Sequence, residues 1–129
     1  MTFVDTNVIM YSVGRPHPLR EPAREFFAES ARLRRVLCTS AEVLQELMHA
    51  YLPVQRESTL DSAMALVARA RIEVWPLESD DVHLAWRLRP RFPMLSARDL
   101  CHLASCRRRS VTDIKTFDRA FAAAIRPRR

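Results

Sequence analysis

The chain has 129 residues, of which 48% are hydrophobic, and it carries a formal net charge of +6. This length fits one domain with a substantial core, and no apolar run approaches the roughly 20 residues that a membrane-spanning helix needs. A single glycine against eight prolines excludes the glycine-rich phosphate loops of ATPases and dinucleotide enzymes. The excess of basic over acidic residues indicates an anionic partner, and nucleic acid is the first candidate.

Cysteine usage and the N-terminus both indicate a reducing compartment. Cys38, Cys101 and Cys106 are an odd number of cysteines without zinc-ligand spacing, so free thiols are expected instead of disulfides. Cys38 is expected in a strand core. The N-terminus enters a strand directly and has no signal-peptide pattern. We therefore expect a cytoplasmic protein.

The hydrophobic pattern predicts strands that alternate with helices. The first strand is short and contains Phe3 and Val4, and Asp5 stands at its end. Further strands are predicted at 35–39, 72–75 and 111–115. A helical turn is predicted at 8–11, and helices at 19–33, from 39 to about 52, and at 60–70, 79–88, 97–108 and 117–124. Such alternation favours parallel pairing, so residues 1–129 are expected to form a single three-layer α/β/α sandwich with a short, mainly parallel sheet.

Polar residues before two of the helices indicate N-caps. Thr39 and Glu42 have capping-box spacing before the helix that ends near residue 52. Ser79 is expected to cap the helix at 79–88, and Asp80 and Asp81 in its first turn are expected to complement the helix dipole.

A run of three arginines at 107–109 is expected to close the helix at 97–108, where cations suit the dipole and bind the last carbonyls. Contact with an RNA backbone is the alternative for this run, and the same alternatives apply to the arginine-rich residues 126–129.

Four acids follow strands or fall in the helices just after them, namely Asp5, Glu46, Asp99 and Asp118. In a parallel α/β fold, ligand sites gather outside the carboxyl ends of the strands. Local structure also explains three of these acids. Asp5 suits a turn or helix cap, Asp99 has capping-box spacing from Ser96, and Asp118 suits a helix N-terminus.

Helical geometry separates Glu46 from its neighbour Glu42. A turn of about 100° per residue places Glu42 nearly opposite the apolar stripe of its helix, whereas Glu46 lies at the border of the stripe and can look into a cleft. Asp113 also lies near the fourth acid, but it should project from the other end of its strand. We therefore prefer Glu46 and Asp118 as site residues.

If the four acids converge, a cation must accompany them, because two unit charges about 4 Å apart repel by roughly 4 kcal/mol at an effective dielectric constant of 20. An all-oxygen site favours Mg²⁺ or Mn²⁺. Such ions lower the pKa of a bound water and stabilise the departing oxygen of a phosphodiester. His102 lies one turn after Asp99 and could face the same cleft, although a lone helical histidine is more often structural.

The four acids lie in four blocks of sequence. These are FVDTNV at 3–8, TS at 39–40 followed by EL at 46–47, LSARDLCHLA at 95–104, and TFDRAF at 116–121. In this order they resemble the PIN-domain nucleases, and within these the VapC-type toxins of bacterial toxin-antitoxin pairs, over nearly the whole chain. The resemblance implies a PIN-like fold, an acidic metal site and polar supporting positions. The acidic residues are then Asp5, Glu46, Asp99 and Asp118, and the supporting residues are Thr6, Asn7 and Thr116.

The resemblance also implies a function. It predicts a Mg²⁺- or Mn²⁺-dependent endoribonuclease that cleaves RNA and inhibits translation, that is bound by a cognate antitoxin, and that forms a homodimer. One alternative is a receiver-type signalling module that binds Mg²⁺ around a phosphorylated aspartate, but Cys38-Thr39 and Lys115-Thr116 fit its strand ends poorly. The other is a non-catalytic RNA-binding PIN scaffold without metals, and four intact acids argue against it.

Overall fold

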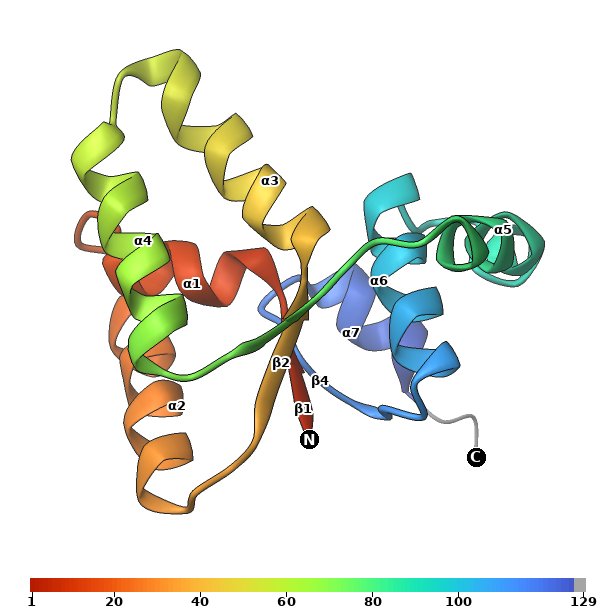
Figure 1. The fold of residues 1–129 in the computed structure, drawn as a ribbon, viewed down its shortest axis with the longest axis horizontal. Helices are drawn as coiled ribbons and strands as arrows, with labels where there is room; N and C mark the ends of the chain where they lie inside the picture. The colour runs from red at the N-terminus through yellow and green to blue at the C-terminus, as the bar shows by residue number, and fades with distance from the viewer. Residues whose placement is uncertain (127–129) are drawn as a thin grey trace.

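Four short parallel strands form the centre of the molecule (Figure 1). The computed structural model describes residues 1–126, so residues 127–129 of the arginine-rich tail lie outside the described residues. The sheet has the order β3-β2-β1-β4. Its strands are β1 (Thr2–Val4), β2 (Leu37–Ser40), β3 (Glu73–Trp75) and β4 (Asp113–Lys115). The predicted parallel α/β class is confirmed.

Helices cover both faces of this sheet and complete the three layers (Figure 1). On one side lie α1 (Thr6–Val13), α2 (Arg20–Arg32), α3 (Ala41–Tyr51) and α4 (Glu57–Arg69). On the other side lie α5 (Ser79–Leu88), α6 (Ala97–Arg108) and α7 (Arg119–Ile125). Short 3-10 turns follow α3 at Leu52–Val54 and α5 at Arg89–Arg91. Among residues 1–126, no helix is both long and apolar enough to cross a membrane.

One element differs in kind from the prediction, because α1 is a helix of eight residues where only a turn at 8–11 was expected. It begins at Thr6 because the Asp5 side chain accepts a hydrogen bond from the Thr6 backbone N–H, which supplies the cap. Asp5 is therefore the single residue between β1 and this helix, and the helix carries the polar residues that follow Asp5. The other predicted elements agree with the structure to within about three residues.

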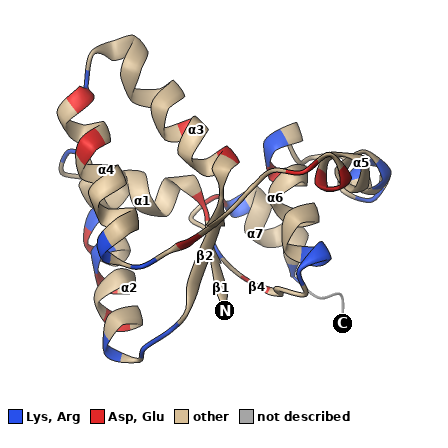
Figure 2. Cartoon of the chain, viewed as in Figure 1, with Lys and Arg blue, Asp and Glu red and all other residues tan. Residues whose placement is uncertain are grey.

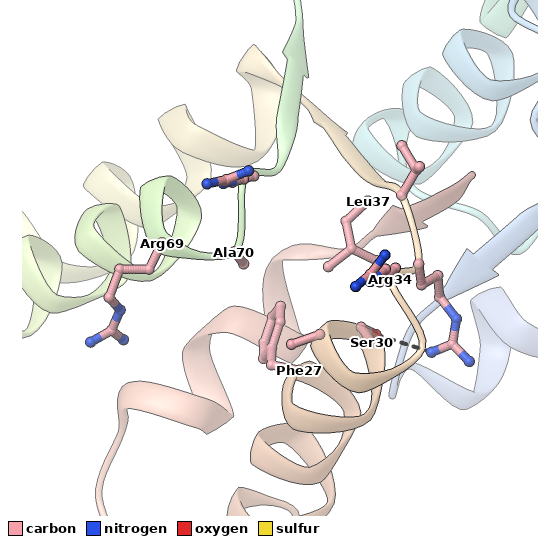
Figure 3. A pocket seen from close by; sticks show the side chains of 10 residues that line it. Phe27, Ser30, Arg34, Leu37, Arg69 and Ala70 are labelled. Carbon is pink, nitrogen blue, oxygen red and sulfur yellow. Dashed lines mark hydrogen bonds between the residues drawn. The ribbon is translucent and has the colours of Figure 1, made fainter.

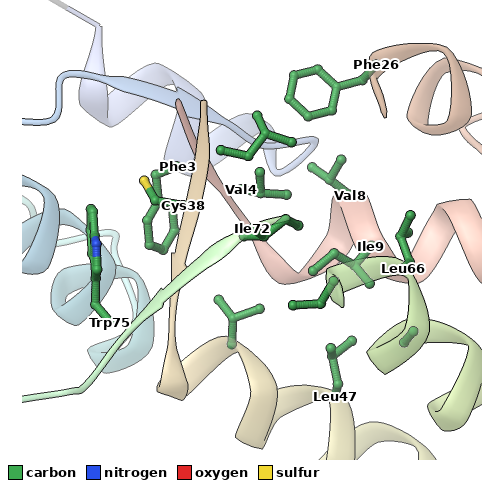
Figure 4. Close-up of a cluster of buried hydrophobic side chains, with 14 of the residues drawn as sticks. Phe3, Val4, Val8, Ile9, Phe26, Cys38, Leu47, Leu66, Ile72 and Trp75 are labelled. Carbon is green, nitrogen blue, oxygen red and sulfur yellow. The ribbon is translucent and has the colours of Figure 1, made fainter. Parts of the chain in front are cut away.

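Side chains of the strands alternate between the two helical layers. Figure 4 shows Phe3, Cys38 and Trp75 on one side of the strands and Val4 and Val8 on the other. The Phe3 ring lies 6.0 Å from that of Trp75, between ring centroids. The predicted core position of Cys38 is confirmed, because this side chain is fully buried. A second apolar cluster joins α5, α6 and α7, and its buried members include Leu88, Leu103 and Phe121.

Two of the predicted helix caps are wrong. Thr39 belongs to β2, and its hydroxyl donates to the Val4 carbonyl oxygen at 2.8 Å, so it ties two strands together instead of forming a box with Glu42. The N-cap of α5 is Glu78, not Ser79, and Glu78 and Asp81 form the capping box. In both places a tertiary or neighbouring partner outcompetes the local hydrogen bond that the spacing predicted.

Asp81 does more than complement the dipole of α5. Its side chain is fully buried, and its Oδ1 accepts from Arg108 at 2.8 Å and from Arg109 at 3.0 Å. The guanidinium of Arg109 also lies 4.8 Å from the ring centroid of Trp75. Two arginines of the run at 107–109 therefore hold the start of α5 against the end of α6, which favours the structural interpretation of these two over RNA contact.

Replacing Asp81 by Ala is expected to destabilise the fold by about 2 to 3 kcal/mol, because it removes the buried acceptor that two guanidinium groups and the Glu78 backbone N–H share. The value lies at the low end for a buried pair because Arg108 and Arg109 are 28% and 20% exposed. Urea unfolding measures the difference. Asp80→Ala is the matched control, since Asp80 is 74% exposed and approaches Arg108 only to 3.6 Å. Equal midpoints for the two variants would contradict a structural role for Asp81.

Candidate functional site

The order of the strands locates a crevice beside β1. The chain passes from β1 through β2 to β3 on one side and then crosses to β4 on the other side. In open α/β sheets, ligands bind outside the carboxyl ends of the strands where the order reverses in this way. Asp5 leaves β1 at that point, and the Thr116 hydroxyl after β4 donates to Asp5 Oδ2 at 2.7 Å. Receiver-type folds have the order 2-1-3-4-5, so the receiver alternative does not fit.

Asp5 is held in one position by three donors. Its Oδ1 accepts from the Thr6 N–H at 2.8 Å, and its Oδ2 accepts from the Thr116 hydroxyl and from the Asn7 amide at 3.3 Å. The residue is only 4% exposed. Burial raises the pKa of Asp5, and the nearby His102 and the Thr116 hydrogen bond offset this only in part, so the pKa stays above its ordinary value.

Glu46 enters the same crevice from α3. Its Oε2 accepts from the Thr6 hydroxyl at 2.8 Å, and its Oε1 lies 2.9 Å from His102 Nε2. Burial acts to raise the pKa of Glu46, but the hydrogen bonds and the charge of His102 outweigh burial and lower it overall. Glu42 instead faces Arg98 at 3.9 Å. The geometry therefore agrees with the choice of Glu46 over Glu42 made from the helical angle.

His102 is the site residue for which the sequence pattern favoured a structural role. It is 1% exposed, and its ring packs 5.3 Å from that of Phe3. Its Nε2 nevertheless contacts Glu46 and lies 3.9 Å from Asp5 Oδ1. Burial lowers the pKa of His102, but the hydrogen bond to Glu46 and the surrounding negative charges raise it overall. The sequence indicated that His102 could reach the site only through its spacing, because it lies three residues after Asp99 and so on the same face of the helix.

Asp99 is half-buried in the first turn of α6. Ser96 caps this helix as predicted, because its hydroxyl accepts from the Asp99 N–H at 3.1 Å. The reciprocal bond of a capping box, from the Asp99 carboxylate to Ser96 N–H, is absent from the described residues. Burial, and next the charge of Asp5, raise the pKa of Asp99 to about 6. The carboxylate therefore belongs to the acidic cluster and not to the cap.

Asp118 lies at the rim of the site. It is exposed and is the N-cap of α7, where its Oδ1 accepts from the Phe121 N–H at 3.0 Å. The backbone N–H of Asp118 donates to the Thr116 hydroxyl, and its charge contributes to the raised pKa of Asp99. Asp113 accepts from the Thr2 hydroxyl at the opposite end of β4, as expected.

The donor set fits a divalent cation. Asp5, Asp99 and His102 each offer one ligand atom, and these atoms all lie within 4.8 Å of one another. Burial together with the mutual repulsion of carboxylates raises the pKa of Asp99, and a bound cation would relieve both effects. A histidine nitrogen also lies among these candidate ligand atoms, whereas the sequence predicted a site of carboxylate oxygens alone. Glu46 and Asp118 border this group through His102 and Thr116, respectively.

A cavity of about 560 Å³ lies elsewhere, between the ends of α2 and α4 (Figure 3). Phe27 and Leu37 contribute to an apolar lining, and the side chain of Arg69 points away from both. Figure 2 shows acidic residues where the strands meet α1 and α3, and arginines at the opposite ends of α2 and α4. None of the four acids lines this cavity, and its lining residues Leu37 and Arg71 lie at or near the amino ends of β2 and β3, opposite the strand ends that carry the acids.

Comparison with known proteins identifies the family. Residues 2–126 match the PIN domain family. The chain belongs to the PIN domain family, and within it to the VapC type. Ribonuclease VapC23 of Mycobacterium tuberculosis (strain H37Rv) is 60% identical over 98% of this chain and 99% of that protein. Ribonuclease VapC13 of the same strain is 36% identical over 94% of this chain and 92% of that protein.

Solved structures agree in fold. The Mycobacterium tuberculosis VapC20, a sarcin-ricin loop cleaving toxin, superposes with a TM-score of 0.75 at 23% identity, covering 96% of this chain and 95% of that one. A chain from VapBC2 of Rickettsia felis, bound to a promoter DNA fragment, superposes with a TM-score of 0.69 at 15% identity, covering 95% and 91%. These similarities show that the strand order and layers described above are those of the PIN fold.

Proposed function

We propose that this chain is an endoribonuclease that uses Mg²⁺ or Mn²⁺ to hydrolyse RNA phosphodiester bonds, and that it is the toxin of a toxin-antitoxin pair. The observation that carries the proposal is the convergence of buried acids and His102 at the carboxyl ends of β1 and β4. Two relatives that span the chain are named ribonucleases, which supports the same activity.

In this proposal four acids hold the metal, and they differ in how close they lie to it. Asp5 and Asp99 provide oxygens closest to the centre of the cluster, Glu46 borders it, and Asp118 completes the rim. A bound divalent ion would supply activation of water and stabilisation of the departing oxygen. The full set is Asp5, Glu46, Asp99 and Asp118.

The polar neighbours keep the acids oriented. Thr116 and Asn7 both donate to Asp5 Oδ2, and Thr6 donates to Glu46 Oε2. His102 acts on Glu46 from the other side, so the Glu46 carboxylate has a donor on each oxygen. We assign to His102 a positioning role, because a carboxylate with both oxygens engaged has little freedom to turn away.

Cleavage of single-stranded RNA by the purified chain tests the activity. Product is expected in Mn²⁺ or Mg²⁺ and is expected to vanish in EDTA, because EDTA removes the ion that activates water and stabilises the departing oxygen. Equal cleavage in EDTA would contradict the metal-dependent mechanism. RNA binding without cleavage under any metal would support the non-catalytic scaffold instead.

Metal binding is expected to raise the melting temperature. An ion at 100 times its dissociation constant stabilises the folded state by about 2.7 kcal/mol, which corresponds to a rise of several degrees. The pKa of Asp99 is raised to about 6, so below that pH the residue carries a proton that the metal must displace. The Mn²⁺-induced rise should therefore be large at pH 7.5 and smaller at pH 5. A rise that does not depend on pH would contradict the place of Asp99 in the metal site.

We also propose a protein partner, the cognate antitoxin, and a homodimer. Exposed apolar side chains on one end of α3 and the following turn support an interface, since Met48, Leu52 and Val54 are 45%, 42% and 60% exposed. The molar mass of the chain, measured by light scattering, is expected to be twice 15.0 kDa. A mass of one chain would contradict the homodimer, and no change on adding the product of the adjacent gene would contradict the antitoxin.

A further inference from the structure

A second cavity, of about 310 Å³, borders the acidic site. Its volume lies at the lower end of the range for small-molecule pockets, which suits one nucleotide and not a duplex. It opens between α1, the loop that follows α1, and the end of α3. Its lining residues include Asn7, Tyr11, Gly14, His17, Tyr51 and Arg56.

One face of α1 connects the cavity to the acidic site. Asn7, Tyr11 and Gly14 follow one another at intervals of four and three residues, so they share a face of the helix. Asn7 donates to Asp5 at one end of this face. Gly14, the single glycine of the chain, lies at the other end, where a Cβ would come 2.8 Å from the Met10 carbonyl oxygen. One wall of the cavity therefore extends along α1 from Asn7, which contacts the Asp5 carboxylate, to Gly14, which has no side chain.

The wall carries an aromatic surface. The rings of Tyr11 and His17 lie 4.6 Å apart between centroids and 31° from parallel. His17 is fixed between two prolines, and its Nδ1 accepts from the Leu19 N–H at 3.0 Å. Phe117 contacts the Tyr11 ring edge to face at 5.9 Å. A half-buried aromatic ring held in place by other rings is a surface on which an unstacked base packs.

The charge of the lining is positive at the end away from the acids. Arg15 and Arg56 line the cavity, and no carboxylate does. The guanidinium of Arg56 lies 5.4 Å from the ring centroid of Tyr51, and Arg56 donates to the Thr59 hydroxyl at 3.3 Å. Within residues 1–126 neither arginine forms an ion pair with an acid. Both guanidinium groups thus remain available to a phosphate.

We propose that this cavity binds one nucleotide of single-stranded RNA next to the bond that is cleaved. The base stacks on the Tyr11–His17 pair, and Arg56 with Arg15 holds the phosphate farther from the acidic site. The inference rests on the proposed nuclease function for its position beside the scissile bond. The binding itself needs only the aromatic surface and the two cations.

The affinity of the full chain for a short single-stranded RNA, measured in EDTA by fluorescence anisotropy, tests the proposal. Tyr11→Leu removes the ring while keeping an apolar side chain, and it should weaken binding about ten-fold. Tyr11→Phe keeps the ring and should bind like the parent. Trp86→Leu is the matched control, because Trp86 is a 62% exposed aromatic on α5 that does not line the cavity.

The salt dependence separates the phosphate contact from stacking. Arg56→Gln should reduce the slope of log affinity against log salt by about 0.7, the value for one phosphate of a single strand, whereas Tyr11→Leu should leave the slope unchanged. Arg69→Gln, an arginine outside this cavity, is the control. The same RNA annealed to its complement should show no loss with Tyr11→Leu, because its bases are already stacked.

The outcomes distinguish this inference from the proposed function. Equal RNA affinity of the Tyr11→Leu and Trp86→Leu variants would overturn the proposed nucleotide subsite, even if the parent cleaves RNA. The cavity would then be assigned to a protein partner. Weaker binding by Tyr11→Leu with no cleavage by the parent in Mn²⁺ upholds the subsite and overturns the nuclease function. If Tyr11→Leu does not fold, His17→Ala replaces it, with the same direction of change expected.

Discussion

Asp99→Asn is expected to lower RNA cleavage to below about 1% of the parent rate, beyond the range typical of residues that only orient a ligand. The same substitution is expected to raise the melting temperature of the protein in EDTA. Both effects have one cause, since the carboxylate is half-buried beside the negative charges of Asp5 and Asp118, which His102 offsets only in part and a bound metal would compensate. Initial rates on single-stranded RNA in Mn²⁺ and thermal melts in EDTA measure the two effects.

The gain in stability should depend on pH. The folded protein raises the pKa of Asp99 from 3.8 to about 6, so the folded state holds this proton more tightly than the unfolded state does. Stability therefore falls as pH rises through this interval, and the loss is complete above about pH 6. An asparagine at position 99 does not ionise, so the variant does not lose this stability as the pH rises. The difference between Asp99→Asn and the parent should be large at pH 7.5 and should nearly vanish at pH 4.

Ser96→Ala is the control for local structure, because Ser96 caps the helix that carries Asp99. It should destabilise the protein by about 1 kcal/mol while cleavage remains close to that of the parent. The two variants are thus expected to change stability in opposite directions, and only Asp99→Asn is expected to change activity. If Asp99→Asn cleaves RNA like the parent, Asp99 has no catalytic role, and the block of sequence around it supports only the fold.

Glu46→Gln is expected to lower cleavage at least about 100-fold, whereas Glu42→Gln should leave it close to that of the parent. The two glutamates are one helical turn apart, carry the same charge and differ in what they face. Glu46 contacts Thr6 and His102, while Glu42 approaches Arg98 at 3.9 Å, a distance at which a surface ion pair contributes little. Comparing the two variants therefore distinguishes the effect of the position of the carboxylate from the effect of removing one negative charge.

Rates for the two variants should be measured at equal protein concentration after thermal melts show that both fold. Equal rates for both would mean that the carboxylate of Glu46 is dispensable. A loss confined to Glu42→Gln would mean that the other face of α3 meets the substrate. Either result would remove Glu46 from the proposed metal site.

The local part of the fold was predictable because it depends on contacts between residues near in sequence. Periodicity located the strands and helices to within about three residues, although α1 was expected only as a turn, and Ser96 was identified as a cap from its spacing to Asp99. The angle of a helix also separated Glu46 from Glu42 before any packing was known. The three thiols are free, as the count of cysteines predicted.

Contacts between distant segments were not predictable in this way. His102 and Glu46 are 56 residues apart, and Arg108 and Asp81 are 27 apart, so no local pattern pairs them. Thr39 was expected to make a local capping hydrogen bond and instead bonds a neighbouring strand, and Asp81, which was expected only to complement a helix dipole, also binds two distant arginines. Asp118 kept its local role as a cap and therefore lies at the rim of the site.

The sequence by itself determined the alternation of strands and helices and the parallel α/β class, and it singled out four acids that follow strands or fall in helices, because side-chain spacing along a strand or helix decides which face is apolar. Only the tertiary structure decided that β4 lies beside β1, and hence that Thr116 meets Asp5. It also decided that His102 turns inward between Phe3 and Glu46, because the register of α6 against the sheet comes from the packing of whole elements.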